Sequence, residues 1–227
     1  MRVNLVDQGN VYHLAVHLDA DEDVFARGQW DAPIEMTTTT ASLELKSAST
    51  LHPDLAALAV LMIVRPWVKR RLTLDSAVSQ GFADVAFEAT GVEIGPIADQ
   101  IPQRERGRRH ALAFSGGIDG MAADNMISGD LAYFHFARKR HPRVPNRATH
   151  LRTDASLAMI EQVVATGRSV HIATSDLEFV AARPFPTFAH WVTMAIEPVL
   201  RADDEDIGAI VMGRHIAGVY VNSGLYF

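Results

Sequence analysis

The feature that most limits the fold of this chain is an apolar run that ends at two glycines and is followed by a helical pattern. Ala111–Phe114 is a short, continuous apolar segment typical of a buried strand, and Asp119–Met126 is predicted to be a helix. Ser115, Gly116 and Gly117 occupy the bend between them. Because glycine carries no Cβ, such a bend lets successive main-chain N–H groups point into one concavity beside the N-terminus of a helix. That geometry suits a bulky anion such as phosphate.

Strands and helices continue to alternate along the second half of the chain. Further strands are predicted at Leu131–Phe136, Val170–Thr174 and Ile207–Met212. Helices are predicted from Asp154 to Gly167 and from Pro186 to Leu200. Short apolar strands that alternate with helices indicate an α/β domain, in which a parallel sheet carries helices on both faces.

The first hundred or so residues show a different pattern, without a functional motif or an internal repeat. The predicted elements are a β-hairpin from Val3 to Leu18 about the bend Gln8–Asn10, a strand at Thr37–Leu45, a helix from His52 to Val64, a strand at Val68–Leu74, and a helix capped by Asp75 or Ser76 that ends near Gly91. These elements form a small α+β module. A charged, proline-marked linker at 101–109 separates it from the second half, which predicts domains 1–106 and 107–227.

Charge and composition exclude several classes of protein. Residues 1–106 carry nine Lys and Arg against fifteen Asp and Glu, whereas residues 107–227 carry twelve of each. Neither half is basic, which argues against nucleic acid as a partner. Cysteine is absent, which excludes disulfides, thiolate zinc sites and cysteine nucleophiles. The longest apolar run, Leu55–Val64, is far shorter than the roughly 20 residues of a membrane span and lies far from the N-terminus, so we expect a cytoplasmic protein with no membrane partner.

The bend and its surroundings also resemble a known family. The stretch Ala113–Ala123, with Ser-Gly-Gly-Ile-Asp at 115–119, is similar to the Ser-Gly-Gly-x-Asp-Ser signature of the PP-loop ATP pyrophosphatases, which include asparagine and cyano-deazaguanine synthases. The resemblance covers roughly residues 109–215, and only the loop is specific. It implies a HUP-type fold that binds ATP with Mg²⁺, activates a substrate by adenylation and releases pyrophosphate.

The resemblance also implies roles for individual residues. Ligands of open α/β sheets bind beyond the carboxyl ends of the strands, so residues that follow the strands are expected to converge on one crevice. By this implication the nucleotide-binding residues are Ser115, Gly116, Gly117, Ile118, Asp119, Gly120 and Gly213, the metal ligands are Asp119 and Asp176, and the catalytic residues are Asp119, Arg214 and His215. Asp176 is equally consistent with an Asx turn that ends its strand.

Two departures from the signature leave alternatives open. Gly120 stands where the family has a serine, and the loss of one placed donor can lower a rate by about 10²–10³. The chain also ends at Phe227, soon after the last predicted strand, which indicates a C-terminally shortened domain, or a site that a second copy or a partner protein completes. The alternatives are a degenerate module that binds ATP or AMP without cleaving it, and an interaction module whose acidic first half binds a partner. The sequence does not identify the small-molecule second substrate.

Overall fold

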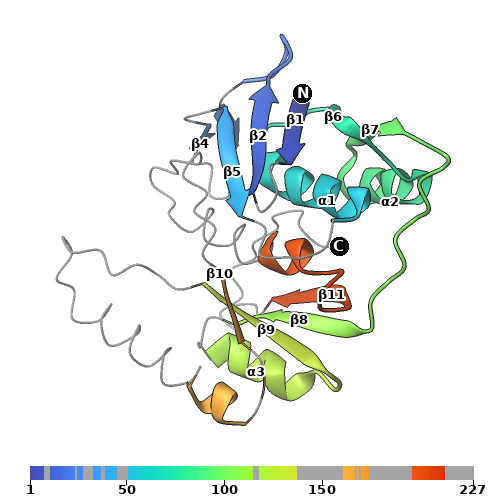
Figure 1. Ribbon diagram of the computed structural model, residues 1–227. Coiled ribbons are helices and arrows are strands. Elements are labelled where there is room, and N and C mark those ends of the chain that lie inside the picture. The colour runs from blue at the N-terminus through green and yellow to red at the C-terminus, as the bar shows by residue number, and fades with distance from the viewer. Residues whose placement is uncertain are drawn as a thin grey trace. The chain divides into compact units, whose positions relative to one another are not determined.

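The computed structural model describes residues 1–7, 11–23, 25–27, 33–36, 39–44, 51–114, 118–136, 161–166, 168, 170–173 and 196–212 (Figure 1). These residues form two compact units. The first unit holds the described residues up to Glu105 together with 196–204, and the second holds those from Arg106 to Ala173 together with 205–212. Both units are mixed α/β structures that contain parallel strands. None of the helices in the described ranges is long and apolar enough to cross a membrane.

The first unit is built on a mixed sheet with the strand order β5-β2-β1-β6-β7. Its strands are β1 (Arg2–Asp7), β2 (Val11–His17), β5 (Thr40–Glu44), β6 (Arg71–Val78) and β7 (Glu93–Ile97), and a separate ribbon pairs β3 (Phe25–Arg27) with β4 (Pro33–Glu35). The hairpin is confirmed, since β1 and β2 pair antiparallel from Arg2 opposite His17 to Asp7 opposite Tyr12. β1, β6 and β7 run parallel to one another.

Two helices of this unit, α1 and α2, differ in how well the sequence predicted them. α1 (Pro53–Val64) begins and ends as expected, with Pro53 in its first turn. α2 (Gln80–Thr90) ends at Gly91, which has φ 71°, but the predicted caps Asp75 and Ser76 are wrong. Both residues lie in β6, because that strand continues to the buried Val78, which pairs with Ile97 of β7. Ser79 caps α2 instead, and its hydroxyl accepts the N–H of Phe82.

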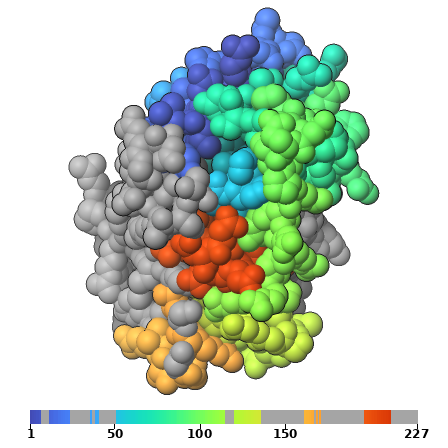
Figure 2. All heavy atoms as spheres, turned by 45° about the vertical axis from the view of Figure 1, so that its right-hand side comes forward, coloured from blue at the N-terminus to red at the C-terminus, as the bar shows by residue number. Residues whose placement is uncertain are grey.

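Side chains of α2 and β7 lie on the surface of the first unit. They are drawn in teal and green in Figure 2, and they include Val85, Phe87 and Ile97, each more than two-fifths exposed. β7 is an edge strand that the sequence analysis missed. Its Pro96 removes an N–H donor, as is common in edge strands that avoid pairing with other chains.

The second unit contains a sheet of four parallel strands in the order β10-β9-β8-β11. These are β8 (Arg109–Ala113), β9 (Leu131–Phe136), β10 (Val170–Ala173) and β11 (Ile207–Met212), and all four predicted strands are confirmed. β8, the first of these four strands along the chain, therefore lies inside the sheet. The next two strands follow on one side of it and the last lies on the other side, which is the order of doubly wound nucleotide-binding folds.

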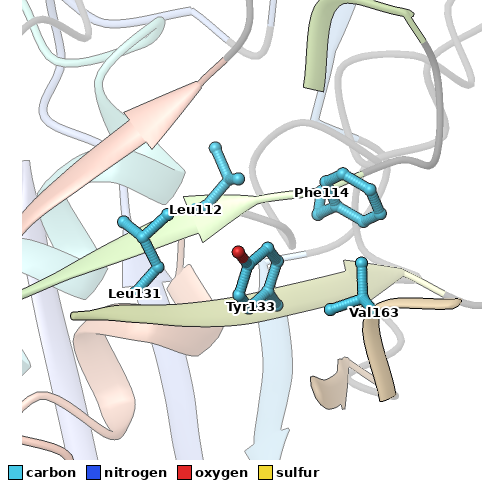
Figure 3. Close-up of a cluster of buried hydrophobic side chains, with 5 residues drawn as sticks. All are labelled: Leu112, Phe114, Leu131, Tyr133 and Val163. Atoms are coloured by element: carbon cyan, nitrogen blue, oxygen red, sulfur yellow. The ribbon is translucent and has the colours of Figure 1, made fainter. Parts of the chain in front are cut away.

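A cluster of buried apolar side chains lies on one face of this sheet (Figure 3). Its members come from β8 and the residue after it, from β9 and from the helical segment 161–165, and they are Leu112, Phe114, Leu131, Tyr133 and Val163. Ala123 of α3 (Ile118–Met126) and Ile127 pack against the cluster. Side chains alternate between the two faces of a strand, and on the opposite face Ala111, Ala132 and Phe134 are fully buried. Burial on both faces explains why 111–113 of β8 and 131–134 of β9 are apolar without interruption.

Candidate functional site

The candidate site is the carboxyl edge of the second sheet, where β8 and β11 lie side by side. The last residues of these two strands, Ala113 and Met212, are register partners. Strand order reverses between β8 and β11, because β9 and β10 both lie on the other side of β8. In open parallel sheets ligands bind beyond the carboxyl ends of the strands at this switch point. Residues 115–117, which follow β8 and Phe114 in the sequence, lie outside the described residues, and α3 begins at Ile118, one residue before the prediction.

Several of the predicted site residues lie outside the described residues, namely Ser115, Gly116, Gly117, Asp176, Gly213, Arg214 and His215. Ile118 and Asp119 are the first two residues of α3, and Gly120, the third, is buried. No group of three or more His, Cys, Asp or Glu that could hold a metal ion occurs within the described ranges. The predicted metal ligands Asp119 and Asp176 therefore remain a prediction.

The strand ends that precede the predicted site residues are not equally close to one another. Ala113 and Met212, which precede the bend and Gly213, are neighbours in the sheet. Ala173 ends β10, which lies three strand positions from β11. At about 4.8 Å per strand this separation is roughly 14 Å. The end of β8 therefore lies beside the end of β11, and the strand that precedes Asp176 ends farther away.

His135 lies at the same edge of the sheet, and the sequence analysis did not select it. It belongs to β9 and is buried, and its Nδ1 lies 2.9 Å from the carbonyl oxygen of Phe114. A carbonyl can only accept, so Nδ1 carries the proton of this hydrogen bond. The N–H of Phe114 donates to the carbonyl of Phe134 at 2.8 Å. Both main-chain polar groups of the residue before the bend are thus bonded to β9. The signal that could have identified His135 was its position near the end of the predicted strand Leu131–Phe136.

A second polar cluster connects α3 to the sheet. The Tyr133 hydroxyl donates to Asp124 Oδ1, and Arg168 Nη1 lies 3.0 Å from the same carboxylate oxygen and also contacts the hydroxyl. Burial first, and then the hydrogen bond to Asp124, raise the pKa of Tyr133 to about 12. The phenol therefore stays protonated at neutral pH and cannot act as a base there. We interpret this cluster as structural support for α3.

The first unit contains Ser, His and Asp close together, but not in a catalytic order. Asp54 accepts both the N–H and the hydroxyl of Ser79, at 2.8 and 2.7 Å. His52 Nδ1 accepts the N–H of Asp54 at 3.2 Å. In a nucleophilic triad the histidine lies between serine and carboxylate, whereas here the carboxylate bonds to serine directly. Because Ser79 caps α2 and His52 caps α1, this network joins two helix N-termini and is structural.

An open hollow of about 740 Å³ also lies in the first unit, between α2, β6 and β7. Its charged and amide side chains bond to one another. Arg71 Nε donates to Glu93 at 2.9 Å, and Gln80 Nε2 donates to Asp84 at 2.7 Å. Since these bonds satisfy the polar lining internally, we assign no chemistry to this hollow.

Comparisons with known proteins do not add to this description. No family model, characterised protein or solved structure matches the chain. We therefore infer function from the residues and the strand order alone.

Proposed function

We propose that the second unit is a HUP-like, PP-loop domain that binds ATP at the carboxyl edge of its sheet and activates a small-molecule substrate by adenylation. The observation that carries this proposal is the strand order β10-β9-β8-β11. It supports the proposal because β8, the strand that precedes Ser115, Gly116 and Gly117 in the sequence, borders the switch point, and α3 follows these residues.

The proposed roles follow from the chemistry of each group. Main-chain N–H groups of 115–117 and the N-terminus of α3 bind the β- and γ-phosphates, and the Ser115 hydroxyl adds a donor. Asp119 and Asp176 would hold Mg²⁺, which would neutralise phosphate charge. Arg214 and His215 follow β11, the neighbour of β8, in the sequence, and the proposal assigns them to the reacting end of the nucleotide.

In the proposed reaction a substrate oxygen bonds to the α-phosphorus of ATP. The bond from that phosphorus to the bridging oxygen breaks, and pyrophosphate leaves with the bond electrons. A nitrogen nucleophile then displaces AMP from the activated substrate. The protein contributes mainly by holding the reactants in line and by placing positive charge and N–H donors at the phosphates.

Gly120 favours a second candidate function. It is the third residue of α3 and is buried, so the hydroxyl that the PP-loop signature places there is missing. Backbone N–H groups still bind phosphate without it, whereas stabilisation of the transition state is weakened. The second candidate is therefore a module that binds ATP or AMP without cleaving it.

Calorimetry with α,β-methylene ATP and Mg²⁺ tests binding, and pyrophosphate release from ATP separates the two functions. We expect Gly116→Val to lower affinity at least about tenfold, because a branched side chain blocks close approach of phosphate to the backbone. The matched control is Gly95→Ala in the first unit, where an added Cβ meets nothing closer than 4.0 Å. Binding without pyrophosphate release, with a cell extract supplying substrates, identifies the second function. If the wild-type protein bound no nucleotide in this titration, both candidate functions would be contradicted.

A further inference from the structure

We infer that the hollow of about 740 Å³ between α2, β6 and β7 is a docking site for a protein segment that carries a large apolar side chain flanked by Lys or Arg. The inference concerns the first unit and is independent of nucleotide binding by the second. Two observations carry it, namely the exposed apolar side chains that line the hollow and the negative charge of the surface around it.

The apolar part of this site comes from both α2 and β7, whose side chains lie on the surface in Figure 2. Phe87, Pro96 and Ile97 line the hollow, and Phe87 and Ile97 are 52 % and 43 % exposed. Ala83 and Asp84 lie four and three residues before Phe87, so one side of α2 faces the hollow. The hydrogen bonds within the lining satisfy much of its polar surface. A partner therefore gains free energy chiefly by covering the apolar surface.

The charge around the hollow is negative. Residues 72–103, which include α2 and β7, contain five Asp or Glu and no Lys, Arg or His. Among the described residues that line the hollow, Arg71 is the basic one, and its Nε donates to Glu93 at 2.9 Å. That pair is neutral, so Asp84 in the lining and the exposed Glu88 set the sign of the local charge. Lys or Arg beside the apolar anchor of a partner complements it.

Asp84 and Glu88 occupy positions that cost α2 stability. They are four residues apart, so two like charges lie on one side of the helix. Glu88 also lies in the last turn, near the negative end of the helix dipole, and that turn has no basic residue. Because these carboxylates weaken the helix that carries them, the stability of the fold does not explain them. A cationic partner does, since it neutralises both.

Other occupants fit the site less well. A second copy that docked through the same surface would bring Asp84 and Glu88 against acidic residues, because a two-fold interface pairs a surface with itself. Addition of a strand along β7 is disfavoured, since Pro96 has no N–H to donate. The site therefore suits side-chain contacts from a cationic segment of another protein.

The test determines the chemistry of the partner without assuming its sequence. A library of short random peptides displayed on phage is selected on the full chain, and the enriched peptides are synthesised and titrated by calorimetry. We expect these peptides to combine large apolar residues with Lys or Arg, and we expect their affinity to fall as the salt concentration rises.

One pair of variants tests the apolar contact. Phe87→Ser is expected to weaken peptide binding at least about tenfold, because it removes the largest exposed apolar side chain of the lining. Val85→Ser is the matched control, since Val85 is 54 % exposed on the same helix but is not among the residues that line the hollow. Its affinity is expected to stay within about twofold of the wild type.

A second pair of variants tests the charge. Asp84→Asn keeps the shape of the side chain and is expected to weaken binding about threefold to tenfold and to reduce its salt dependence. Glu161→Gln removes an exposed carboxylate from the second unit and is expected to change neither quantity. Thermal unfolding of all four variants confirms that each is folded at the temperature of the titration.

The remaining outcomes overturn the inference or separate it from the proposed function. It is overturned if the library yields no binder, if the binders lack basic residues, or if Phe87→Ser binds them as well as the wild type does. Sedimentation of the wild type alone provides a further check, since self-association that Phe87→Ser abolishes would make a second copy the occupant. A wild type that binds such peptides but no nucleotide supports this inference and contradicts only the proposed function.

Discussion

A Cβ atom added to Gly208 would lie only 1.9 Å from the carbonyl oxygen of Gly107. A Cβ atom added to Gly107 would also be too close to the main chain, since it would lie 2.3 Å from the carbonyl oxygen of Asp206. Gly208 also marks the register shift between β11 and β8. Two backbone segments thus pass at a distance that only glycine allows, next to the amino ends of the strands that border the switch point.

Gly208→Ala is expected to destabilise the protein by about 2–3 kcal/mol, because the new methyl group meets main-chain atoms that cannot move aside as a side chain can. Urea denaturation measures the loss. Gly95→Ala serves as the control, since space is available there, and it is expected to change the free energy of unfolding by less than about 1 kcal/mol. Equal stability of the two variants would contradict the close contact of Gly107 and Gly208.

Tyr133 predicts a dependence of stability on alkaline pH. Its pKa is raised from an ordinary value of 10.0 to about 12 in the folded protein. The folded state therefore favours the neutral phenol, and the stability that results is fully present below pH 10 and is lost as the pH rises through 12.

Substitution of Tyr133 tests this dependence. Between pH 10 and pH 12 the free energy of unfolding of the wild type should fall more steeply than that of Tyr133→Phe, which has no proton to lose. Denaturant titrations at a series of pH values measure both slopes. Parallel slopes would show that Tyr133 titrates alike in the folded and unfolded states.

Ser79→Ala tests the structural interpretation of the first unit's Ser, His and Asp residues. The substitution removes the N-cap of α2 and one of the hydrogen bonds to the buried Asp54, so we expect a loss of about 1–2 kcal/mol. Thermal or urea unfolding measures this loss, and nucleotide affinity is expected to be unchanged. A fall in pyrophosphate release without any loss of stability would instead indicate that Ser79 takes part in chemistry.

Removal of Mg²⁺ tests whether the metal contributes to nucleotide binding at the proposed site. With EDTA present, the bend and α3 alone must balance the charge of the triphosphate. Affinity for α,β-methylene ATP is then expected to fall at least about tenfold, as calorimetry would measure. Adenosine affinity is the internal control and should not change, because adenosine carries no charge for the metal to neutralise.

The sequence alone predicted the elements whose signals are local. β9 and β11 were predicted with their observed ends, because each is a short, mostly apolar run that begins directly after an aspartate. α1 was likewise predicted, because Pro53 begins it and Pro66 follows its end. The paired-glycine bend between strand and helix belongs to the same class of signal, since glycine determines locally which backbone conformations are open.

Only the tertiary structure determined which segments meet. Asp75 and Ser76 have the chemistry of helix caps, but pairing of Val78 with β7 keeps them in a strand. The strand order that places β11 beside β8, and the hydrogen bond between His135 and Phe114, join residues far apart in the chain. Such pairings depend on the summed burial of both sheet faces and on the geometry of the whole sheet. No local pattern records that sum, which is why the sequence predicted the strands β8 and β11 and only the folded sheet showed that they are neighbours.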